Sequence, residues 1–288
     1  MIRLYYYTKL EYALAAIKNK RLKIALYSAL NDPFDFVGIA YSNSNQKKQI
    51  EELQKKLSSL SGIICLSQTW KEPLMWGHYA DSHKGVCLGF EIQPGQYKPI
   101  KYVSQRPTLA SFGKRSIAKL SEQDREIIAF NKFEQWSYEK EWRRIVPLEE
   151  SDLVDGNYYL PFDENMVLKS VLFGARAEIS DHKINQIIAS TDDVKIAFTA
   201  PASTEFDIVI DQAKTKARVP ENNRVLNIHV PPTAKFSEVL GKLLVDFITA
   251  RPLLHDGIRK FGETYFSMSN QPAEVEHLSQ EPQKITKI

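Results

Sequence analysis

Two glutamates separated by one residue are the strongest candidates for chemistry in this sequence. Glu139 and Glu141 lie in the segment Trp136–Val146, and extended backbone from Glu139 onward would place both carboxylates on one face together with Arg143. A fixed carboxylate can bond a ribose hydroxyl and stabilise the oxocarbenium charge that develops when an N-glycosidic bond breaks. The pair could equally be solvent-facing charges offset by neighbouring lysine and arginine residues, and the sequence leaves both interpretations open.

Aromatic residues gather in two other segments. Thirteen Tyr, fourteen Phe and four Trp make up 11% of the chain, which is enough to build an aromatic ligand site. In the N-terminal run, strand alternation would place Tyr6 and Thr8 on one face. Further along, Trp76, His78 and Tyr79 precede a glycine-led strand. Clusters of this kind pack as core at least as often as they form a ligand platform.

The common catalytic signatures are missing. The sequence contains no P-loop, GxGxxG, HExxH, GxSxG or kinase-type motif. Cys65 and Cys87 belong to no CxxC pair, and Cys87 sits in an apolar strand, where it is expected to be a small buried hydrophobe. The histidine and aspartate spacing matches no regular ligand pattern, so no metal site is predicted.

Composition limits the class of protein. The chain of 288 residues carries a net charge of +3, which argues against a protein built to coat nucleic acid. It has no apolar run long enough for a membrane helix and no secretory signal, and its two cysteines fit a reducing compartment. We therefore expect a cytoplasmic protein that does not associate with membranes.

Hydrophobic periodicity predicts an α+β fold in which strands dominate and helices are interspersed irregularly. The expected strands are Ile2–Tyr7, Arg21–Tyr27, Gly62–Ser67, Val86–Phe90, Lys98–Val103, Glu141–Pro147, Val167–Phe173 and Val194–Thr199, and the expected helices are Leu10–Lys18, Ser44–Ser61 and Ser180–Ala189.

The character of the chain changes near residue 220. We expect an α+β domain over residues 1–219, a helical extension over 220–269 and a disordered tail over 270–288. An apolar face around Leu240–Ile248 could clamp the domain, pair two copies of the chain or contact a partner protein.

Four sequence blocks resemble the signature of a large uncharacterised bacterial domain family, a domain of unknown function. The blocks are Leu30–Asp35 (LNDPFD), Met75–Phe90 (MWGHYADSHKGVCLGF), Trp136–Ile145 (WSYEKEWRRI) and Leu172–Arg176 (LFGAR). They occur in the family's order across roughly residues 1–200. The resemblance implies a setting in bacterial phage defence and abortive infection.

The opening LYYYTKLEYALAAIKNKRLKI is similar to the first strand, helix and second strand of ADP-ribosyltransferases, especially the DNA-modifying toxins. Glu139-Lys140-Glu141 is similar to their Glu-x-Glu signature. The resemblance implies a mainly antiparallel two-sheet core with flanking helices and Glu141 as the catalytic carboxylate. It also implies that Tyr6 and Thr8 bind the ribose, and that Tyr79 or Trp76 stacks on nicotinamide. Tyr6 stands where a histidine is usual in that family.

These observations favour an ADP-ribosyltransferase-like protein that uses NAD as a substrate, without a metal, in a defence or toxin setting. It would transfer ADP-ribose to a nucleic-acid or protein acceptor, or hydrolyse NAD. Glu139 would position the acceptor, and the rim of the pocket would come from Asn31, Asp32, Asp35 and His78. A non-catalytic sensor of a nucleotide or phage component is the alternative. A metal-dependent nuclease using Asp32, Asp35, His78 and Glu141 is the third hypothesis.

Overall fold

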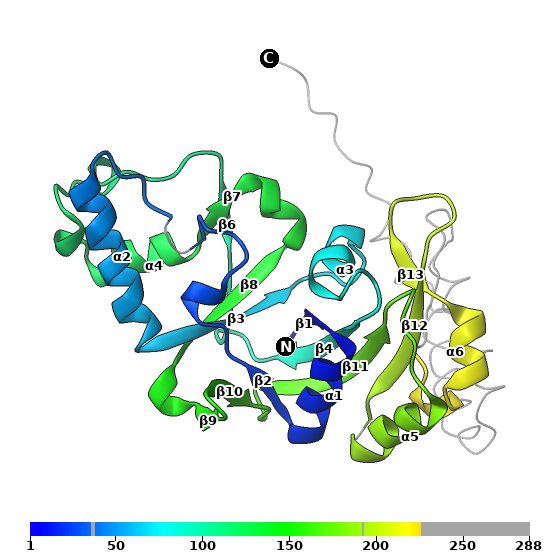
Figure 1. Ribbon diagram of the computed structural model, residues 1–288. Coiled ribbons are helices and arrows are strands. Elements are labelled where there is room, and N and C mark those ends of the chain that lie inside the picture. The colour runs from blue at the N-terminus through cyan, green and yellow to red at the C-terminus, as the bar shows by residue number, and fades with distance from the viewer. Residues whose placement is uncertain (36–37, 192, 226–288) are drawn as a thin grey trace, which may run out of the picture. The chain divides into compact units, whose positions relative to one another are not determined.

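The computed structural model describes residues 1–35, 38–191 and 193–225, of which Met1–Val225 form one compact unit (Figure 1). The strands are β1 Ile2–Thr8, β2 Arg21–Lys23, β3 Ser61–Ser67, β4 Val86–Ile92, β5 Lys98–Pro99, β6 Lys101–Val103, β7 Asn131–Phe133, β8 Glu141–Pro147, β9 Asp152–Val154, β10 Asn157–Pro161, β11 Met166–Phe173, β12 Lys195–Pro201 and β13 Ile208–Ile210. The α-helices are α1 Leu10–Asn19, α2 Ser44–Ser58, α3 Pro73–Tyr79, α4 Glu122–Ala129, α5 Asp181–Ser190 and α6 Gln212–Arg218. From residue 226 onward, the extension predicted over 220–269 and the tail predicted over 270–288, including Leu240–Ile248, lie outside the described residues.

The predicted α+β class and the predominance of antiparallel pairing are confirmed. One eight-stranded sheet has the order β13-β12-β11-β4-β1-β3-β8-β5, and within it only β11 and β12 run parallel. A three-stranded sheet (β2-β10-β9) and a two-stranded sheet (β6-β7) accompany it. The described chain therefore has one dominant sheet and two small ones, and not the two-sheet core that we expected.

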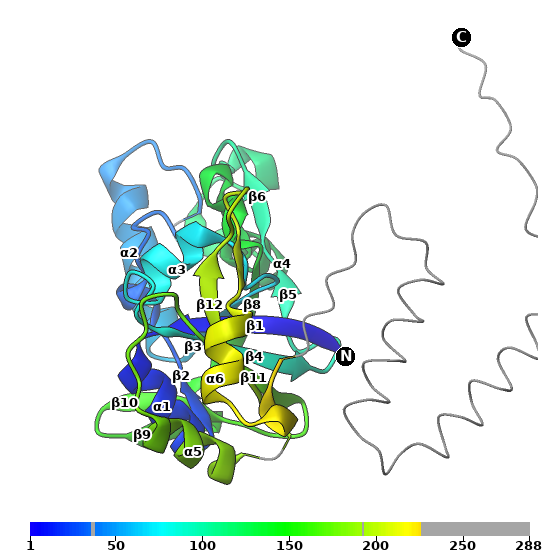
Figure 2. The ribbon, with the colours of Figure 1, turned by 90° about the vertical axis from the view of Figure 1, so that its right-hand side faces the viewer.

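Helices cover both faces of the large sheet. Alternate strand residues such as Leu4 and Leu88 face the core beneath α1 and α5, while Tyr7 and Cys87 face the opposite core beneath α3. Figure 2 shows the β12 end of the sheet with α6 packed against it. This two-sided burial explains why β4 reads as a nearly continuous apolar run.

Two predicted strands change partner along their length. The strand predicted over Arg21–Tyr27 ends at Lys23, because Ala25 pairs instead with Ile63 of β3 before a 3-10 turn begins at Tyr27. The strand predicted over Lys98–Val103 is divided between β5, which pairs with β8, and β6, which pairs with β7. The first change brings the loop after β2 beside β3, and the second places β7 next to β6 outside the large sheet.

The large sheet opens between β1 and β3. The pairing of β1 with β4 continues from Ile2–Ile92 to Thr8–Val86, and that of β3 with β8 from Ser61–Pro147 to Ser67–Glu141. By contrast, β1 and β3 pair at a single position in the described residues, where Tyr5 lies opposite Ser67. The strands separate beyond that point, and the candidate site lies in the opening.

Substitution of Gly85 tests how closely the backbone packs between the end of β1 and the residue that follows α3. A Cβ at Gly85 would lie 2.2 Å from the carbonyl oxygen of Thr8 and 2.9 Å from that of Ala80, so backbone would have to move. We expect Gly85→Ala to lower the free energy of unfolding by about 1–3 kcal/mol in urea denaturation. At the exposed Gly77 of α3, a Cβ would meet nothing within 4 Å, so Gly77→Ala should be neutral or stabilising. Equal stability of the two variants would contradict this account.

Candidate functional site

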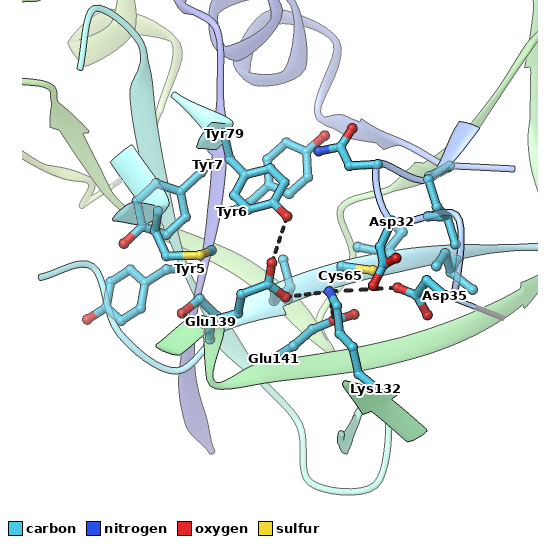
Figure 3. Close-up of a pocket in the computed structure, with 18 of the residues that line it drawn as sticks. Tyr5, Tyr6, Tyr7, Asp32, Asp35, Cys65, Tyr79, Lys132, Glu139 and Glu141 are labelled. Atoms are coloured by element: carbon cyan, nitrogen blue, oxygen red, sulfur yellow. Dashed lines mark hydrogen bonds and ion pairs between the residues drawn. The ribbon is translucent and has the colours of Figure 1, made fainter. Parts of the chain in front are cut away.

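A cavity of about 220 Å³ fills the opening between β1 and β3 (Figure 3). It is lined by both faces of β1 through Tyr5, Tyr6 and Tyr7 and by β3 through Ile63–Ser67. The remaining lining comes from the loop after β2, from α3 and from the segment 132–141. Drug-sized ligands usually occupy roughly 300–1,000 Å³, so this cavity fits one part of a larger molecule.

Glu141 is anchored by two cations at the base of the cavity. Arg143 donates through Nε to Oε1 at 2.8 Å and through Nη2 to Oε2 at 3.1 Å, and Lys132 Nζ donates to Oε2 at 2.9 Å. The backbone N–H of Glu141 donates to the hydroxyl of Tyr102 at 2.8 Å. All three charged side chains are buried, so water screens these contacts little.

Glu139 shares the ammonium group of Lys132 but has a different second partner. Tyr79 donates its hydroxyl to Glu139 Oε1 at 2.6 Å, and Lys132 Nζ donates to Glu139 Oε2. The side chain of Asn31 in turn hydrogen bonds to Tyr79. A chain of polar contacts therefore runs from the loop after β2, through Tyr79, to the paired glutamates.

Asp35 completes the charged network. Arg143 binds both oxygens of Asp35, with Nη1 at 3.0 Å and Nη2 at 2.8 Å, and Lys132 Nζ lies 3.7 Å from Asp35 Oδ2. The described part of this network therefore joins three carboxylates to two cations.

The two glutamates differ in acidity because their neighbours differ. Burial alone would raise the pKa of Glu141, but the charges of Arg143 and Lys132 outweigh it and lower that pKa to about 2. Burial raises the pKa of Glu139, against the opposing attraction of Lys132. Glu141 therefore stays ionised, whereas Glu139 is the carboxyl group that more readily holds a proton.

The local backbone explains how residues 139 and 141 meet. Glu139 ends the 3-10 helix Glu134–Glu139, Lys140 adopts a left-handed conformation with φ of 45°, and β8 begins at Glu141. The strand therefore begins at Glu141, as predicted, and the assumption of extended backbone already from Glu139 was wrong. The solvent-facing interpretation is also wrong, because both glutamates are buried.

The structure gathers most of the predicted site residues but not all of them. Seven line the cavity, namely Tyr6, Asn31, Asp32, Asp35, Tyr79, Glu139 and Glu141. Thr8 is buried at the end of β1, outside the lining. Trp76 is fully buried in the core, where its indole Nε1 donates to the Trp70 carbonyl, and His78 is exposed on the surface of α3.

Lys132 is the functional candidate that sequence reasoning missed. It lies in the short polar strand β7, whose sequence shows no apolar alternation. Arg143 was placed correctly on the face of Glu141, but its burial was not expected. Cys65 also lines the cavity and hydrogen bonds to Glu141, and burial raises the pKa of its thiol, which therefore stays protonated.

Comparison with known protein families matches the part of the chain that builds this network. Residues 75–144 match a family described as a protein of unknown function, DUF2971. This matched stretch contains Tyr79, Lys132, Glu139, Glu141 and Arg143. The predicted resemblance to an uncharacterised domain family is confirmed over these residues. No curated protein and no solved structure matches the chain.

The described residues contain neither a group of metal ligands nor a helix that could span a membrane. Within residues 1–35, 38–191 and 193–225, no three His, Cys, Asp or Glu side chains are grouped so that they could hold a metal ion. The four residues of the nuclease hypothesis therefore do not form a ligand set. No helix in the described part of the chain is long and apolar enough to cross a membrane.

Removing the shared ammonium group should strongly destabilise the fold. Lys132→Met leaves Glu139 and Glu141 buried with less compensation, so we expect the free energy of unfolding to fall by about 3–5 kcal/mol at neutral pH. Without the ammonium, burial raises the pKa of Glu139 further above that of the unfolded chain, while Arg143 still lowers that of Glu141. The folded variant then takes up protons as pH falls, and its deficit should shrink toward about pH 5.

Urea denaturation of wild type and variants at both pH values measures this effect. The pKa of about 2 for Glu141 means that its wild-type contribution persists throughout this window. Lys101→Met is the matched control, because Lys101 is exposed on β6 beside the residue preceding Lys132 and should change stability by no more than about 0.5 kcal/mol. A loss for Lys132→Met that grows toward acid pH would contradict the assigned network.

Proposed function

We propose that this protein is an NAD-using, ADP-ribosyltransferase-like enzyme in a bacterial defence or toxin setting, which transfers ADP-ribose to a macromolecule or hydrolyses NAD. One observation carries the proposal. Two glutamates line one cavity, and their surroundings push their pKa values in opposite directions. Pairs separated in this way are typical of sites that need one permanent charge and one group that exchanges a proton.

Glu141 supplies the permanent charge in this scheme. The bond between nicotinamide and ribose breaks, nicotinamide leaves with the bonding electrons as a neutral molecule, and the ribose carries oxocarbenium charge. A carboxylate with a pKa near 2 is ionised at every physiological pH and stabilises that charge. Its anchoring by Arg143 fixes its position, so little reorganisation is needed as the charge develops.

Glu139 acts on the acceptor in this scheme. An acceptor hydroxyl, amine or water attacks the ribose carbon and loses a proton, and Glu139 is the carboxyl group whose raised pKa suits it to take that proton. Tyr79 holds the orientation of Glu139 through the 2.6 Å hydrogen bond. Glu139 must be ionised when the acceptor attacks and becomes protonated in the step.

The tyrosines give the cavity its walls. Tyr6 and Tyr79 line it and offer aromatic surface to a planar ring. Burial raises the pKa of Tyr6 to about 12, so its hydroxyl remains protonated and can donate a hydrogen bond to a ribose oxygen. The volume of about 220 Å³ suits the nicotinamide end of NAD better than the whole dinucleotide.

A non-catalytic nucleotide sensor is the second candidate, and one observation favours it. Lys132 and Arg143 already neutralise much of the charge on the glutamates, which also suits a site built for stable recognition. A sensor would bind its ligand in the same cavity and release no nicotinamide.

Nicotinamide release from NAD, measured with a range of nucleic-acid and protein acceptors and with water alone, tests the enzyme. We expect Glu141→Gln to lower the rate about 100-fold or more, because it removes the charge that stabilises the oxocarbenium state. Glu149→Gln is the matched control, since Glu149 is exposed just after β8 and its rate should equal that of wild type.

Two outcomes would overturn the enzyme assignment. The first is a wild-type protein that is as inert as Glu141→Gln with every acceptor. The second is a folded Glu141→Gln variant that keeps the wild-type rate. Saturable NAD binding without turnover would favour the sensor instead.

A further inference from the structure

Three aromatic rings form a surface beside the cavity that the proposed chemistry does not use. His78 of α3 lies 6.3 Å, centroid to centroid, from both Trp136 and Tyr138, and the latter two rings are 6.0 Å apart. His78 is exposed and the other two are partly exposed. We call these three residues the aromatic platform. Exposed aromatic clusters of this kind mark interaction sites more often than isolated apolar residues do.

The aromatic platform adjoins the charged network directly. The ammonium group of Lys132 lies 5.3 Å from the centroid of the Trp136 ring, and His78 lies 6.2 Å from Tyr79. Tyr138 immediately precedes Glu139, and the charge of Glu139 contributes to raising the pKa of Tyr138, after burial. None of the three platform residues lines the cavity itself. The platform is therefore a separate surface at the border of the cavity.

Two exposed lysines lie in chain segments that adjoin the network. Lys140 follows Glu139 in the chain, and its carbonyl accepts the backbone N–H of Gln68 at 3.0 Å, three residues before Lys71. The ammonium of Lys71 lies 3.6 Å from Asp207 and 5.9 Å from the centroid of the Trp70 ring. Proteins hold a base and its phosphate by combining aromatic rings with cations.

We propose that the aromatic platform stacks a nucleobase. The argument from size favours the adenine half of the dinucleotide, because a cavity of about 220 Å³ leaves that half outside and the platform is the aromatic surface beside it. The choice of NAD as the molecule that supplies the base rests on the proposed function. A base of an acceptor strand would offer the same stacking chemistry, and the experiment separates the two sources.

Calorimetric titration with AMP and with ribose 5-phosphate tests the proposal, because the two compounds share ribose and phosphate and differ in the base. We expect AMP to bind and ribose 5-phosphate to bind at least tenfold more weakly. Trp136→Ala and Tyr138→Ala should each weaken AMP binding about 5- to 100-fold, as expected for loss of one stacking partner. Phe133→Ala is the control, because Phe133 is an exposed ring in the same segment and should keep affinity within twofold.

Equal binding of AMP and ribose 5-phosphate, or unchanged AMP binding in both platform variants, would overturn the proposal. Because Trp136 contacts Lys132, unfolding transitions of each variant are compared with wild type, and Tyr138→Ala decides if Trp136→Ala does not fold. Competition identifies the source: NAD displaces AMP if the platform serves the dinucleotide, and a single-stranded oligonucleotide alone displaces it if the platform serves an acceptor strand. Displacement by neither overturns the nucleobase assignment.

The outcome is independent of catalysis. AMP binding that depends on the platform, without nicotinamide release, would leave this inference standing while the enzyme assignment fails. If nicotinamide is released and the platform variants bind AMP normally, the enzyme assignment stands and this inference fails.

Discussion

The buried ammonium group of Lys132 is the interaction on which the rest of the site depends. It donates to Glu139 and Glu141 and lies close to Asp35, so it holds together three carboxylates that would otherwise repel one another. Burying such charges is costly unless each finds a partner, and leaving one unpaired costs more than the pair contributes. The positions of the glutamates depend on this one side chain together with Arg143, and the same two cations lower the pKa of Glu141.

The fold delivers Lys132 to this point through short and irregular elements. The chain leaves the large sheet after β5 and forms β6, and β7 pairs with β6 so that Lys132 stands opposite Tyr102. Tyr102 in turn accepts the backbone N–H of Glu141, which fixes the start of β8 beside β7. The long strands β1 and β3 form two walls of the cavity, and their separation leaves room between them. The regular sheet therefore provides the space of the cavity, while the irregular segments provide charged side chains such as Lys132 and Glu139.

This division also explains what the sequence could predict. Hydrophobic patterning identified β1, β3, β4 and β11, because those strands bury apolar residues in long runs. It also placed Glu141 and Arg143 on one face, since strand periodicity alone decides that. Lys132 could not be found, because a three-residue polar strand has no periodic signal and its role arises from contacts with distant residues. Trp76 was misjudged for a related reason: the segment forms helix α3, which turns its indole into the core.

The carboxylates of the network have a further role in the proposed reaction. NAD carries a positive charge on its nicotinamide ring, so a cationic ring entering the cavity favours the ionised form of Glu139 and lowers its pKa. The substrate would thereby prepare Glu139 to accept the proton of the acceptor. When the glycosidic bond breaks, the ring becomes neutral and the positive charge moves to the ribose, next to Glu141. Attraction between the cavity and nicotinamide then weakens as the product forms, so the charge balance that favours binding of the substrate also favours release of the product.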